Sequence, residues 1–382
     1  MRISIRRLPS VLGLLFIAPF LHAQDSPFVP APPNIQVSGY ILQDFHTGHL
    51  LAERNADESL PPASLTKLMT AYLAFEALEK GDIRLDDQTT VSEKAWRMKG
   101  SRMFIEVDKQ VSVGDLLRGM IVQSGNDASV ALAEFIAGSE AGFVGLMNRK
   151  ARRLGLTQTR YANSTGMPDA AHQSTARDIA RLSAALIRDF PRHYPLYAER
   201  EFTYNAIRQY NRNGLLRRDI GVDGLKTGYT EAAGYCLAGS AERKGMRLIA
   251  VVMGAQSKRA REAAVQALLD YGFRFFVTRR LRAADDALID AKVWKAERET
   301  VKLGLVTDLT VTLPKEGEDR LTVSLDAAKR IIAPVRKGQS LGTIRVSLDE
   351  RVLAERPLVA LETIPIGGLW TRGMDSLRLW FK

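Results

Sequence analysis

The hydrophobic pattern of this chain changes near residue 280, and that change limits the folds open to it. Before residue 280, apolar residues at helical spacing alternate with shorter runs typical of strands. After it, apolar residues recur at every second position over short stretches, as in Val301, Leu303 and Leu305, which indicates half-buried strands. A chain of 382 residues is also long for one domain. We therefore predict a mixed helix and strand unit over residues 24–280 and a small all-β domain, a sandwich, over residues 284–357.

Local patterns divide the first unit further. Alternating residues around the turn 44–48 predict two strands within residues 35–55, and residues 233–238 and 247–253 predict a second strand pair. Helices are predicted over residues 64–80, 113–120, 129–137, 141–156, from the cap Thr175 onward, and over 262–276. Residues 89–113 show no dominant period, so we expect loops and short elements there.

Residues 1–23 have the parts of a secretory signal peptide. Three arginines precede the apolar run 11–21, and Ala23 is a small residue at the expected cleavage site. We therefore expect export and a mature chain that starts near Gln24. Leu21 lies where a smaller residue is usual, so an uncleaved anchor stays open as the alternative.

Charge and cysteine content add two expectations. The net charge of +11 and the isoelectric point near 9.7 suit nucleic acid, an anionic membrane or an acidic polymer, and do not choose among them. The one cysteine, Cys236, lies in an apolar stretch. We expect it to be a buried strand residue without a disulfide partner.

Residues 362–382 predict a basic amphipathic helix. Trp370 and Trp380 share one face with other apolar residues, and Arg372 and Arg378 lie on the other face. Such a helix is suited to lying in a membrane interface without crossing the bilayer. A terminal helix packed on its own protein is the alternative.

Ser64 and Lys67 form the first candidate for chemistry. Ser64 stands at the start of an apolar segment with helical spacing, where free backbone N–H groups can stabilise an oxyanion. Lys67 lies three residues later on the same face, so its amine can reach the hydroxyl. Burial or a nearby cation can lower the pKa of a lysine until it acts as a base. Alone, this tetrad is more simply a helix cap beside a surface lysine.

Two further motifs present polar groups to a potential ligand. Ser124 and Asn126 lie on a glycine-containing turn between two predicted helices. Lys226 and Thr227 begin a predicted exposed strand, and Gly228 beside them permits close approach of a ligand backbone. Each motif is weak when it is taken alone.

The order S-x-x-K, S-x-N and K-T-G in one chain is a stronger signal. Together with Gln123–Asp127 and Leu268–Phe276, it resembles the low-molecular-mass penicillin-binding proteins of the 5 and 6 type, which are D-alanyl-D-alanine carboxypeptidases. The resemblance covers nearly the whole chain. It implies an α/β catalytic domain, a sheet flanked by helices as in serine β-lactamases and penicillin-binding proteins. It also implies removal of the terminal D-alanine from peptidoglycan pentapeptides.

The resemblance also implies roles for single residues. Ser64 attacks the carbonyl between the last two D-alanines, Lys67 is the base, kept neutral partly by Lys226, and Ser124 relays a proton to the leaving amine. Arg259 is a rival to Arg261 for the terminal carboxylate. The expected substrate-binding residues are Asn126 at a substrate amide, Tyr229 with Ser64 in the oxyanion hole, Lys226, Thr227 and Arg261 at the carboxylate, and Gly228 in the same strand.

Two departures from the family pattern affect the alternatives. Tyr229 stands where family members often have histidine, which leaves the deacylation rate and its pH profile less defined than acylation. No clear E-x-E-L-N acid segment follows the second motif, which disfavours a β-lactamase. A peptidoglycan DD-endopeptidase stays open, whereas a non-catalytic scaffold is disfavoured because no motif residue is lost.

The resemblance implies partners and a location. We expect the pentapeptide as substrate, β-lactam antibiotics as covalent inhibitors, and the membrane surface as a partner of the C-terminal helix. No nucleic acid, cofactor or metal is expected. The expected location is the periplasmic face of the bacterial inner membrane.

Overall fold

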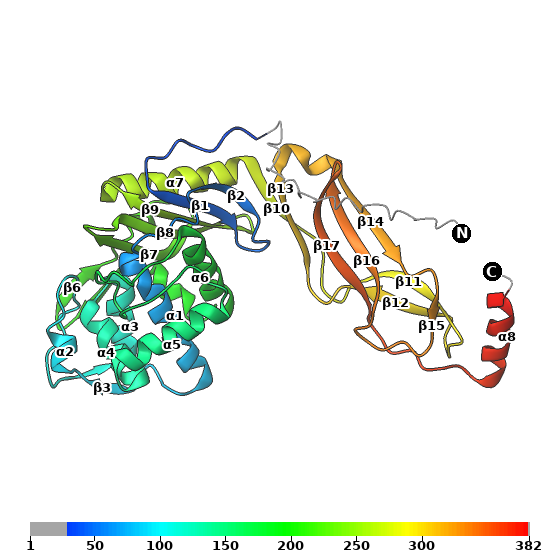
Figure 1. Ribbon diagram of the computed structural model, residues 1–382, viewed down its shortest axis with the longest axis horizontal. Coiled ribbons are helices and arrows are strands. Elements are labelled where there is room, and N and C mark those ends of the chain that lie inside the picture. The colour runs from blue at the N-terminus through cyan, green and yellow to red at the C-terminus, as the bar shows by residue number, and fades with distance from the viewer. Residues whose placement is uncertain (1–28, 381–382) are drawn as a thin grey trace, which may run out of the picture.

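The computed structural model describes residues 29–380 and shows two lobes (Figure 1). The first, here called the α/β lobe, comprises residues 29–275, and the second, the β lobe, begins at Phe276. The terminal helix Leu369–Trp380 (α8) lies at the far end of the β lobe. The predicted order of an α/β unit, a β unit and a terminal helix is confirmed. The predicted signal peptide lies outside the described residues.

An antiparallel sheet of five strands, in the order β2-β1-β9-β8-β7, forms the centre of the α/β lobe. Its strands are β1 (Gly39–Asp44), β2 (Leu50–Arg54), β7 (Val222–Thr230), β8 (Gly234–Arg243) and β9 (Met246–Ala255). Along β9, Leu248 and Ala250 enter one core, and Ile249 and Val251 enter the core on the opposite face. Successive side chains of a strand point to opposite faces, so the unbroken apolar run of β9 reflects a sheet buried on both sides.

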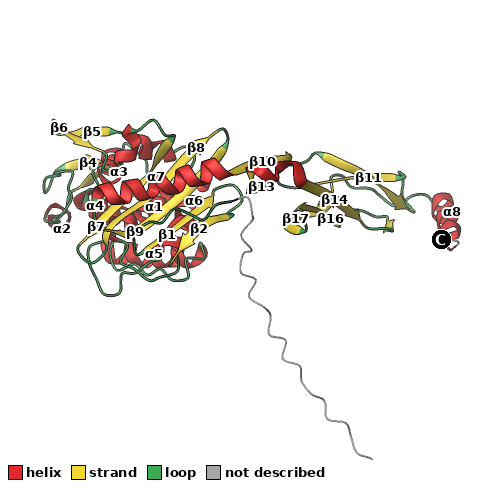
Figure 2. Cartoon of the chain, turned by 90° about the horizontal axis from the view of Figure 1, so that it is seen from above, coloured by secondary structure: helices red, strands yellow, loops and turns green. Residues whose placement is uncertain are grey.

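Helices cover the two faces of this sheet unequally. Helix α7 (Lys258–Phe275) lies along one face, in front of the sheet in Figure 2, and the other helices gather against the opposite face (Figure 1). These are α1 (Lys67–Lys80), α2 (Glu93–Trp96), α3 (Val113–Val122), α4 (Asn126–Ala137), α5 (Glu140–Arg153) and α6 (Ala176–Asp189). Three 3₁₀ turns complete the lobe: η1 (Ala63–Thr66), η2 (Tyr194–Ala198) and η3 (Gly214–Arg217). Two small antiparallel sheets of two strands each pair β3 (Gln88–Thr90) with β4 (Gln110–Ser112), and β5 (Glu201–Tyr204) with β6 (Ile207–Tyr210).

Several helix starts differ from the prediction for local reasons. The helix predicted from residue 64 begins as the 3₁₀ turn η1, so α1 starts at Lys67. Helix α4 starts at Asn126 rather than at residue 129. Helix α7 starts four residues early because the Ser257 hydroxyl accepts the N–H of Ala260 at 3.1 Å and caps it. Cys236 is buried and free, as predicted.

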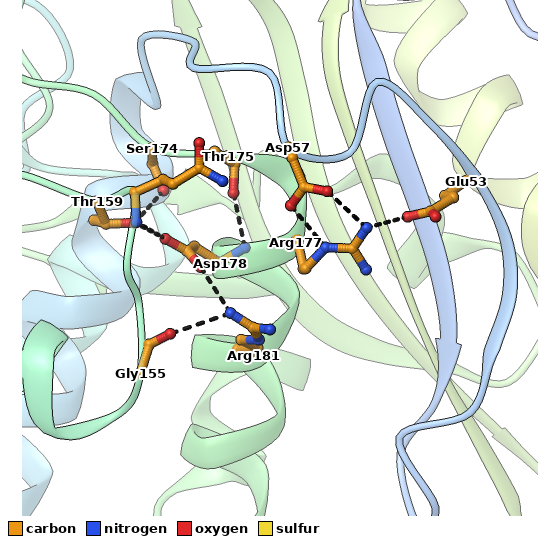
Figure 3. A network of polar contacts seen from close by, with 10 residues as sticks. Glu53, Asp57, Gly155, Thr159, Ser174, Thr175, Arg177, Asp178 and Arg181 are labelled. Carbon is orange, nitrogen blue, oxygen red and sulfur yellow. Dashed lines mark hydrogen bonds and ion pairs between the residues drawn. The ribbon is translucent and has the colours of Figure 1, made fainter. Parts of the chain in front are cut away.

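A polar network anchors the start of α6 (Figure 3). Arg177 forms ion pairs with Glu53 and with Asp57, the latter at 2.7 Å. The buried carboxylate of Asp178 accepts the hydroxyl of Thr159 at 2.8 Å. Since charged groups with several partners have defined positions, this network holds the chain on both sides of the loop 160–175.

The β lobe contains two sheets. Strands β10 (Phe276–Arg282) and β13 (Leu309–Pro314) form one, and the second has six strands in the order β14-β16-β17-β12-β11-β15. The six are β11 (Ala287–Trp294), β12 (Thr300–Gly304), β14 (Leu321–Ala327), β15 (Ile331–Ile332), β16 (Ser340–Leu348) and β17 (Arg351–Ala360); a 3₁₀ turn, η4, covers Lys315–Arg320. Leu303 and Val311 are buried in its core as the alternation predicts, whereas Val323 is exposed, because the edge strand β14 has no buried face. Strand β10 belongs to this lobe although it precedes residue 284, since it pairs with β13.

The two lobes meet through hydroxyl and carboxylate groups. The buried carboxylate of Asp44, at the end of β1, accepts the hydroxyl of Thr278 on β10 at 2.6 Å. The hydroxyls of Thr47 and Thr312 lie 2.7 Å apart. Lys315 donates to the carbonyl of Phe273 in α7 at 2.7 Å. These bonds join the first hairpin and α7 to the start of the β lobe.

Helix α8 touches the β lobe through its polar side. The carboxylate of Asp375 is buried and accepts the backbone N–H of Lys295 at 2.6 Å. Trp370 and Trp380 are 86% and 85% exposed. The helix begins later than predicted, and Ile364 from the predicted segment is instead buried in the β lobe.

Within residues 29–380, no single helix is long and apolar enough to cross a membrane. Only the pair α4 and α5, bent by 84°, passes that test by length and composition.

Candidate active site

Ser64 and Lys67 face each other across one turn of chain. The Nζ of Lys67 lies 3.0 Å from the Oγ of Ser64, because η1 runs directly into α1 and places residues three apart on one face. Lys67 is only 1% exposed. It also donates to the Oδ1 of Asn126 at 2.7 Å and to the carbonyl of Thr165 at 2.6 Å. Three acceptors therefore fix the amine beside the hydroxyl.

Burial makes Lys67 a base at neutral pH. Loss of solvation lowers the pKa of its amine to about 7; nearby Asp127 opposes this effect and Arg212 adds to it. Near pH 7 a large share of the amine is thus neutral and can accept a proton. The sequence suggested Lys226 as the neighbouring charge; Lys67 and Lys226 do repel each other, and Arg212 is a further cation that the sequence did not indicate. The pKa of Lys226 is itself lowered by burial and then by Lys67.

The second motif lines the cavity that contains Ser64. Ser124 lies in the turn between α3 and α4 with φ +66, and its buried side chain lines the same cavity as Ser64. Asn126, the first residue of α4, donates from Nδ2 to the carbonyl of Lys99 at 2.7 Å. The buried carboxylate of Asp127 accepts the backbone N–H groups of residues 103 and 104 at 3.0 and 2.9 Å. Asp127 thus holds the loop that carries Ser101 to the cavity.

The third motif lies on β7, the edge strand of the sheet. Lys226 and Thr227 are buried. A Cβ at Gly228 would lie 3.2 Å from the backbone nitrogen of Ser64 and from the carbonyl of Pro62. Glycine therefore favours the close approach of β7 to the turn at Ser64, because a Cβ here would press on its backbone. The edge of β7 also keeps backbone groups available for an extended peptide.

Arg261 and Arg259 differ in how far their side chains are buried. Arg261 is buried, donates from Nη1 to the carbonyl of Gly228 at 3.1 Å and lines the cavity. Arg259 is exposed and does not line it. Burial lowers the pKa of Arg261. Its guanidinium lies over the ring of Tyr235, which stacks on Tyr229 at 4.3 Å. Of the two candidates, only Arg261 is placed to meet a ligand.

The three motifs share one cleft. Its first part has a volume of about 340 Å³ and is lined by Ser64, Ser101, Ser124, Arg212, Thr227, Gly228, Tyr229, Tyr235, Lys258 and Arg261. Its second part, of about 360 Å³, again contains Ser64, Arg212 and Tyr229 and adds Gly100, Ser101, Asn126, Thr165, Gly166, Met167 and Thr230. Tyr229 is half exposed at 50% and stands at the mouth of both parts. Polar groups from distant parts of the chain thus surround one hydroxyl.

Several residues of this site were missed at the level of sequence. Gly166, with φ +89, lies under the nucleophile turn, where a Cβ would come within 1.9 Å of the carbonyl of Ala63. Asn163 holds this turn by accepting the N–H of Gly166 at 2.8 Å. The run of small polar residues 163–166 was a turn signal, but nothing in it indicated a partner for Lys67. The sequence also gave no indication that Arg212 belongs to the site.

His172 supports the nucleophile turn from behind. The N–H of Ala162 donates to its Nδ1 at 3.3 Å, so the proton is on Nε2, which donates to the hydroxyl of Thr66 at 2.8 Å. Thr66 in turn donates to the carbonyl of Ala63 at 2.8 Å. Burial lowers the pKa of His172 to about 4. The imidazole is therefore neutral in the pH range where Lys67 titrates.

Comparisons with known proteins agree with this geometry. The family model of D-alanyl-D-alanine carboxypeptidases, peptidase family S11, matches residues 26–257, and that of the penicillin-binding protein 5 C-terminal domain matches residues 276–365. D-alanyl-D-alanine carboxypeptidase DacC of Escherichia coli strain K12 is 43% identical over 357 residues, 91% of this chain and 89% of that protein. Penicillin-binding protein 5 of Haemophilus influenzae has a TM-score of 0.84 and 40% identity, covering 88% of this chain and 99% of that one. Penicillin-binding protein D2 of Listeria monocytogenes, solved with ampicillin bound, has a TM-score of 0.59 and 31% identity, covering 64% and 100%.

The fold and the site together define a serine hydrolase of the penicillin-binding protein class. The chain belongs to the D-alanyl-D-alanine carboxypeptidase family, peptidase family S11. It is thus a serine peptidase, and the predicted resemblance, the fold class and the enzyme class are confirmed.

Proposed function

We propose that the enzyme removes the terminal D-alanine from peptidoglycan pentapeptides through an acyl-enzyme on Ser64. The observation that carries the proposal is the 3.0 Å contact between Ser64 and a lysine whose pKa is lowered to about 7. A neutral amine at this distance can accept the hydroxyl proton as the oxygen attacks the carbonyl carbon. The proposal rests on a nucleophile and a base that are already aligned.

The remaining groups fit the later parts of the reaction. The backbone N–H groups of Ser64 and Tyr229 stabilise the oxyanion of the tetrahedral intermediate. Ser124 relays the proton from Lys67 to the amine of the leaving D-alanine. Asn126 and the edge of β7 hold the peptide backbone. Water then attacks the ester, takes the acyl group and restores the hydroxyl of Ser64.

We assign the terminal carboxylate of the substrate to the end of the cleft near Lys226, Arg212 and Arg261, here called the cationic end. Burial is the main cause that lowers the pKa values of Lys226, Arg212 and Arg261. The charges of Arg212 and Arg261 lower the pKa of Lys226 further, and the charge of Arg212 also lowers the pKa values of Arg261 and Lys67. Buried cations that repel one another are stabilised when an anion binds among them. A substrate that ends in a carboxylate supplies that anion, and Thr227 is the neighbouring hydroxyl donor. Gly228 lets the carboxyl end approach the strand.

β-Lactam antibiotics are the proposed covalent inhibitors, because a β-lactam carries a reactive amide beside a carboxylate. Incubation with a labelled penicillin, followed by mass mapping of the adduct, tests the nucleophile directly. We expect one adduct, on the peptide that contains Ser64. An adduct elsewhere would refute the assignment.

Digestion of purified peptidoglycan tests the reaction itself. A carboxypeptidase releases free D-alanine, whereas an endopeptidase splits cross-linked dimers. We expect D-alanine as the main product. Split dimers as the main product would replace this proposal with the endopeptidase.

The proposed location is the periplasmic face of the inner membrane. Helix α8 supports it, because its two exposed tryptophans suit the interface and Arg372 and Arg378 suit anionic lipid. The N-terminal segment 1–23 supports export by its sequence alone.

A further inference from the structure

A cavity at the end of α5 lies outside the cleft and has no part in the mechanism proposed above. It opens between the last turn of α5 and the loop that follows, and its volume is about 660 Å³. None of the residues that line it lines either part of the cleft. They are Asn148, Arg152, Gly155, Leu156, Thr157, Thr159 and Arg160. Two arginines and no carboxylate are therefore among the residues that line this space.

The chain around this cavity is strongly basic. Residues 141–168 contain five cations and no carboxylate. One of the five, Lys150, pairs with Glu76 at 2.8 Å. Arg152 and Arg160 are exposed and form no ion pair with any residue in the described range 29–380. Two cations without a counter-ion at a concave surface favour an anion as the ligand.

The helix dipole explains only one of these two arginines. Arg152 lies in the last turn of α5, where a cation interacts favourably with the carbonyl end of the helix. Arg160 lies beyond the helix, so the dipole does not account for it. The backbone of Arg160 forms a β-bridge with Gln173, with N–O distances of 2.9 and 3.0 Å. This bridge fixes the second cation on the side of the cavity away from the helix.

Hydrogen bonds hold the walls of the cavity in place. Asn148 on α5 accepts the N–H of Tyr161 at 2.9 Å and donates to its carbonyl at 2.8 Å. The buried carboxylate of Asp178 accepts the N–H of Gln158 at 2.9 Å. It also accepts the hydroxyl of Thr159 (Figure 3). A site that is fixed before its ligand arrives loses less conformational entropy on binding.

The cavity is close to the cleft along the chain. Arg160 lines the cavity, and Gly166, six positions later, lines the second part of the cleft. An extended chain advances at most about 3.6 Å per residue, so these two residues lie within roughly 22 Å of each other. Helix α5 belongs to the α/β lobe, whereas α8 lies at the far end of the other lobe (Figure 1). The cavity is thus better placed for an anion of the substrate polymer than for a lipid headgroup beside α8.

We propose that this cavity is an exosite, a binding site outside the cleft, for carboxylates of stem peptides that neighbour the one being cut on the same peptidoglycan polymer. The exosite rests on the proposed function, because each trimmed stem peptide ends in the carboxylate of D-alanine. Arg152 and Arg160 bind such a carboxylate through charge-assisted hydrogen bonds. The exposed hydroxyl of Thr157 is a further donor. Binding of two stem peptides at once raises the effective concentration of the polymer at the cleft.

The test measures binding of the full chain after acylation by a penicillin, which keeps the cleft occupied. The ligands are insoluble peptidoglycan and the same peptidoglycan with its carboxylates converted to amides. The cavity variant, Arg152→Gln with Arg160→Gln, removes both cations of the cavity. The matched control, Arg149→Gln with Arg153→Gln, removes the same charge from exposed arginines of α5 that do not line the cavity.

The unsubstituted protein should distinguish the two forms of peptidoglycan. We expect amidation to raise its dissociation constant about fivefold, the scale of two partly solvated ion pairs. The cavity variant should show this loss with native peptidoglycan and no further loss upon amidation. The control variant should keep most of the difference between the two forms.

Kinetics give a second measurement. The KM for D-alanine release from uncross-linked peptidoglycan strands should rise about fivefold in the cavity variant, with kcat unchanged, because the exosite adds only binding. A single acetylated pentapeptide has no neighbouring stem peptide, so its kcat/KM should be equal in all three proteins.

The outcomes separate the two proposals. Equal dissociation constants for the cavity variant and the control would overturn the exosite. Weaker binding of the cavity variant to vesicles of anionic phospholipid, with peptidoglycan binding unchanged, would also overturn it and assign the cavity to a lipid headgroup. Absence of D-alanine release by the unsubstituted protein, with peptidoglycan binding still dependent on Arg152 and Arg160, would overturn the proposed function and leave the carboxylate site in place.

Discussion

The two lobes treat charge in opposite ways. In the α/β lobe, Lys67, Lys226 and Arg261 are buried around one cleft, and burial lowers the pKa of each. In the β lobe, the ion pairs lie at the surface: Arg279–Glu318, Arg280–Asp308, Arg298–Glu362, Arg320–Asp349 and Arg345–Glu355. Buried cations cost stability unless a partner compensates them, whereas exposed pairs change stability little. The comparison shows that the cations destabilised by burial lie at the cleft, where the chemistry is proposed.

Exposed large apolar side chains occur in both lobes and are most concentrated on α8. The sheet of the α/β lobe is buried on both faces, and its core holds the cleft in shape. The β lobe leaves apolar side chains exposed at its far end, on α8. An exposed aromatic helix at the end of an elongated lobe suits attachment at a distance from the cleft.

The largest expected effect is in the α/β lobe, at the nucleophile. Ser64→Ala should lower penicillin acylation by at least about a thousandfold, on the scale of other nucleophile deletions. The free energy of unfolding should change by only about 1 kcal/mol, because one hydrogen bond, to Lys67, is lost. Intact-mass labelling and thermal unfolding measure both. Persistent labelling of a folded variant would show that Ser64 is not the nucleophile.

The second prediction tests whether the buried cations hold a carboxylate. Arg261→Ala and Lys226→Ala should each slow acylation by peptides that end in D-alanine. The activation free energy should rise by roughly 2 to 5 kcal/mol, which is the cost of an unpaired buried charge. Arg259→Ala is the matched control, since this exposed side chain is two residues away. Equal losses in the Arg259 and Arg261 variants would contradict the assignment.

The third prediction concerns pH. In the proposed mechanism the neutral form of Lys67 is the base, and its pKa is about 7, so the acylation rate should rise with pH below that value and level off above it. On the acidic side the slope should be about tenfold per pH unit. His172 cannot produce this limb, since its pKa is about 4. A rate that stays flat through neutrality would exclude Lys67 as the titrating base.

A fourth prediction addresses the far end of the β lobe. Deletion of residues 369–382 removes α8 but keeps Ile364, which the β core requires. The truncated protein should move from the membrane to the soluble fraction, with D-alanine release from small peptides unchanged. High salt should release the full chain only in part, since it screens the arginines and not the aromatic burial. Truncated protein that stays in the membrane pellet, after signal cleavage is verified, would contradict attachment through α8.

The smallest expected effect is at a surface pair of the β lobe. Arg345→Ala breaks the exposed 2.9 Å pair with Glu355. The free energy of unfolding should fall by no more than about 1 kcal/mol, and penicillin acylation should not change. Urea denaturation gives the first quantity. A loss of several kcal/mol would mean that the surface pairs of this lobe are structural, and the contrast between the lobes would fail.

Much of the architecture could be predicted from local pattern. The strand pair β1–β2 follows from alternation, the pair β8–β9 follows from two short apolar runs, and the cap at Thr175 follows from its spacing to Asp178. Element starts were less predictable, because one hydroxyl such as Ser257 can extend a helix by a turn. Strand β10 could not be assigned to the β lobe from sequence, since its partner β13 lies about thirty residues later and pairing depends on the folded chain.

The sequence by itself determined which residues we propose for the chemistry and one distance between them. Ser64 and Lys67 meet because three residues of helical chain bring them together, whatever surrounds them. Tertiary structure decided what that pair can do. The pKa of Lys67 depends on α4 and the 163–166 turn, which exclude water from it, and on Arg212, 145 positions away in the chain (212 minus 67). Tertiary structure also distinguishes Arg261 from Arg259: the two arginines lie on the same helical turn, and only Arg261 is buried against β7. Desolvation and long-range contact are properties of the packed chain, and no short window of sequence contains them.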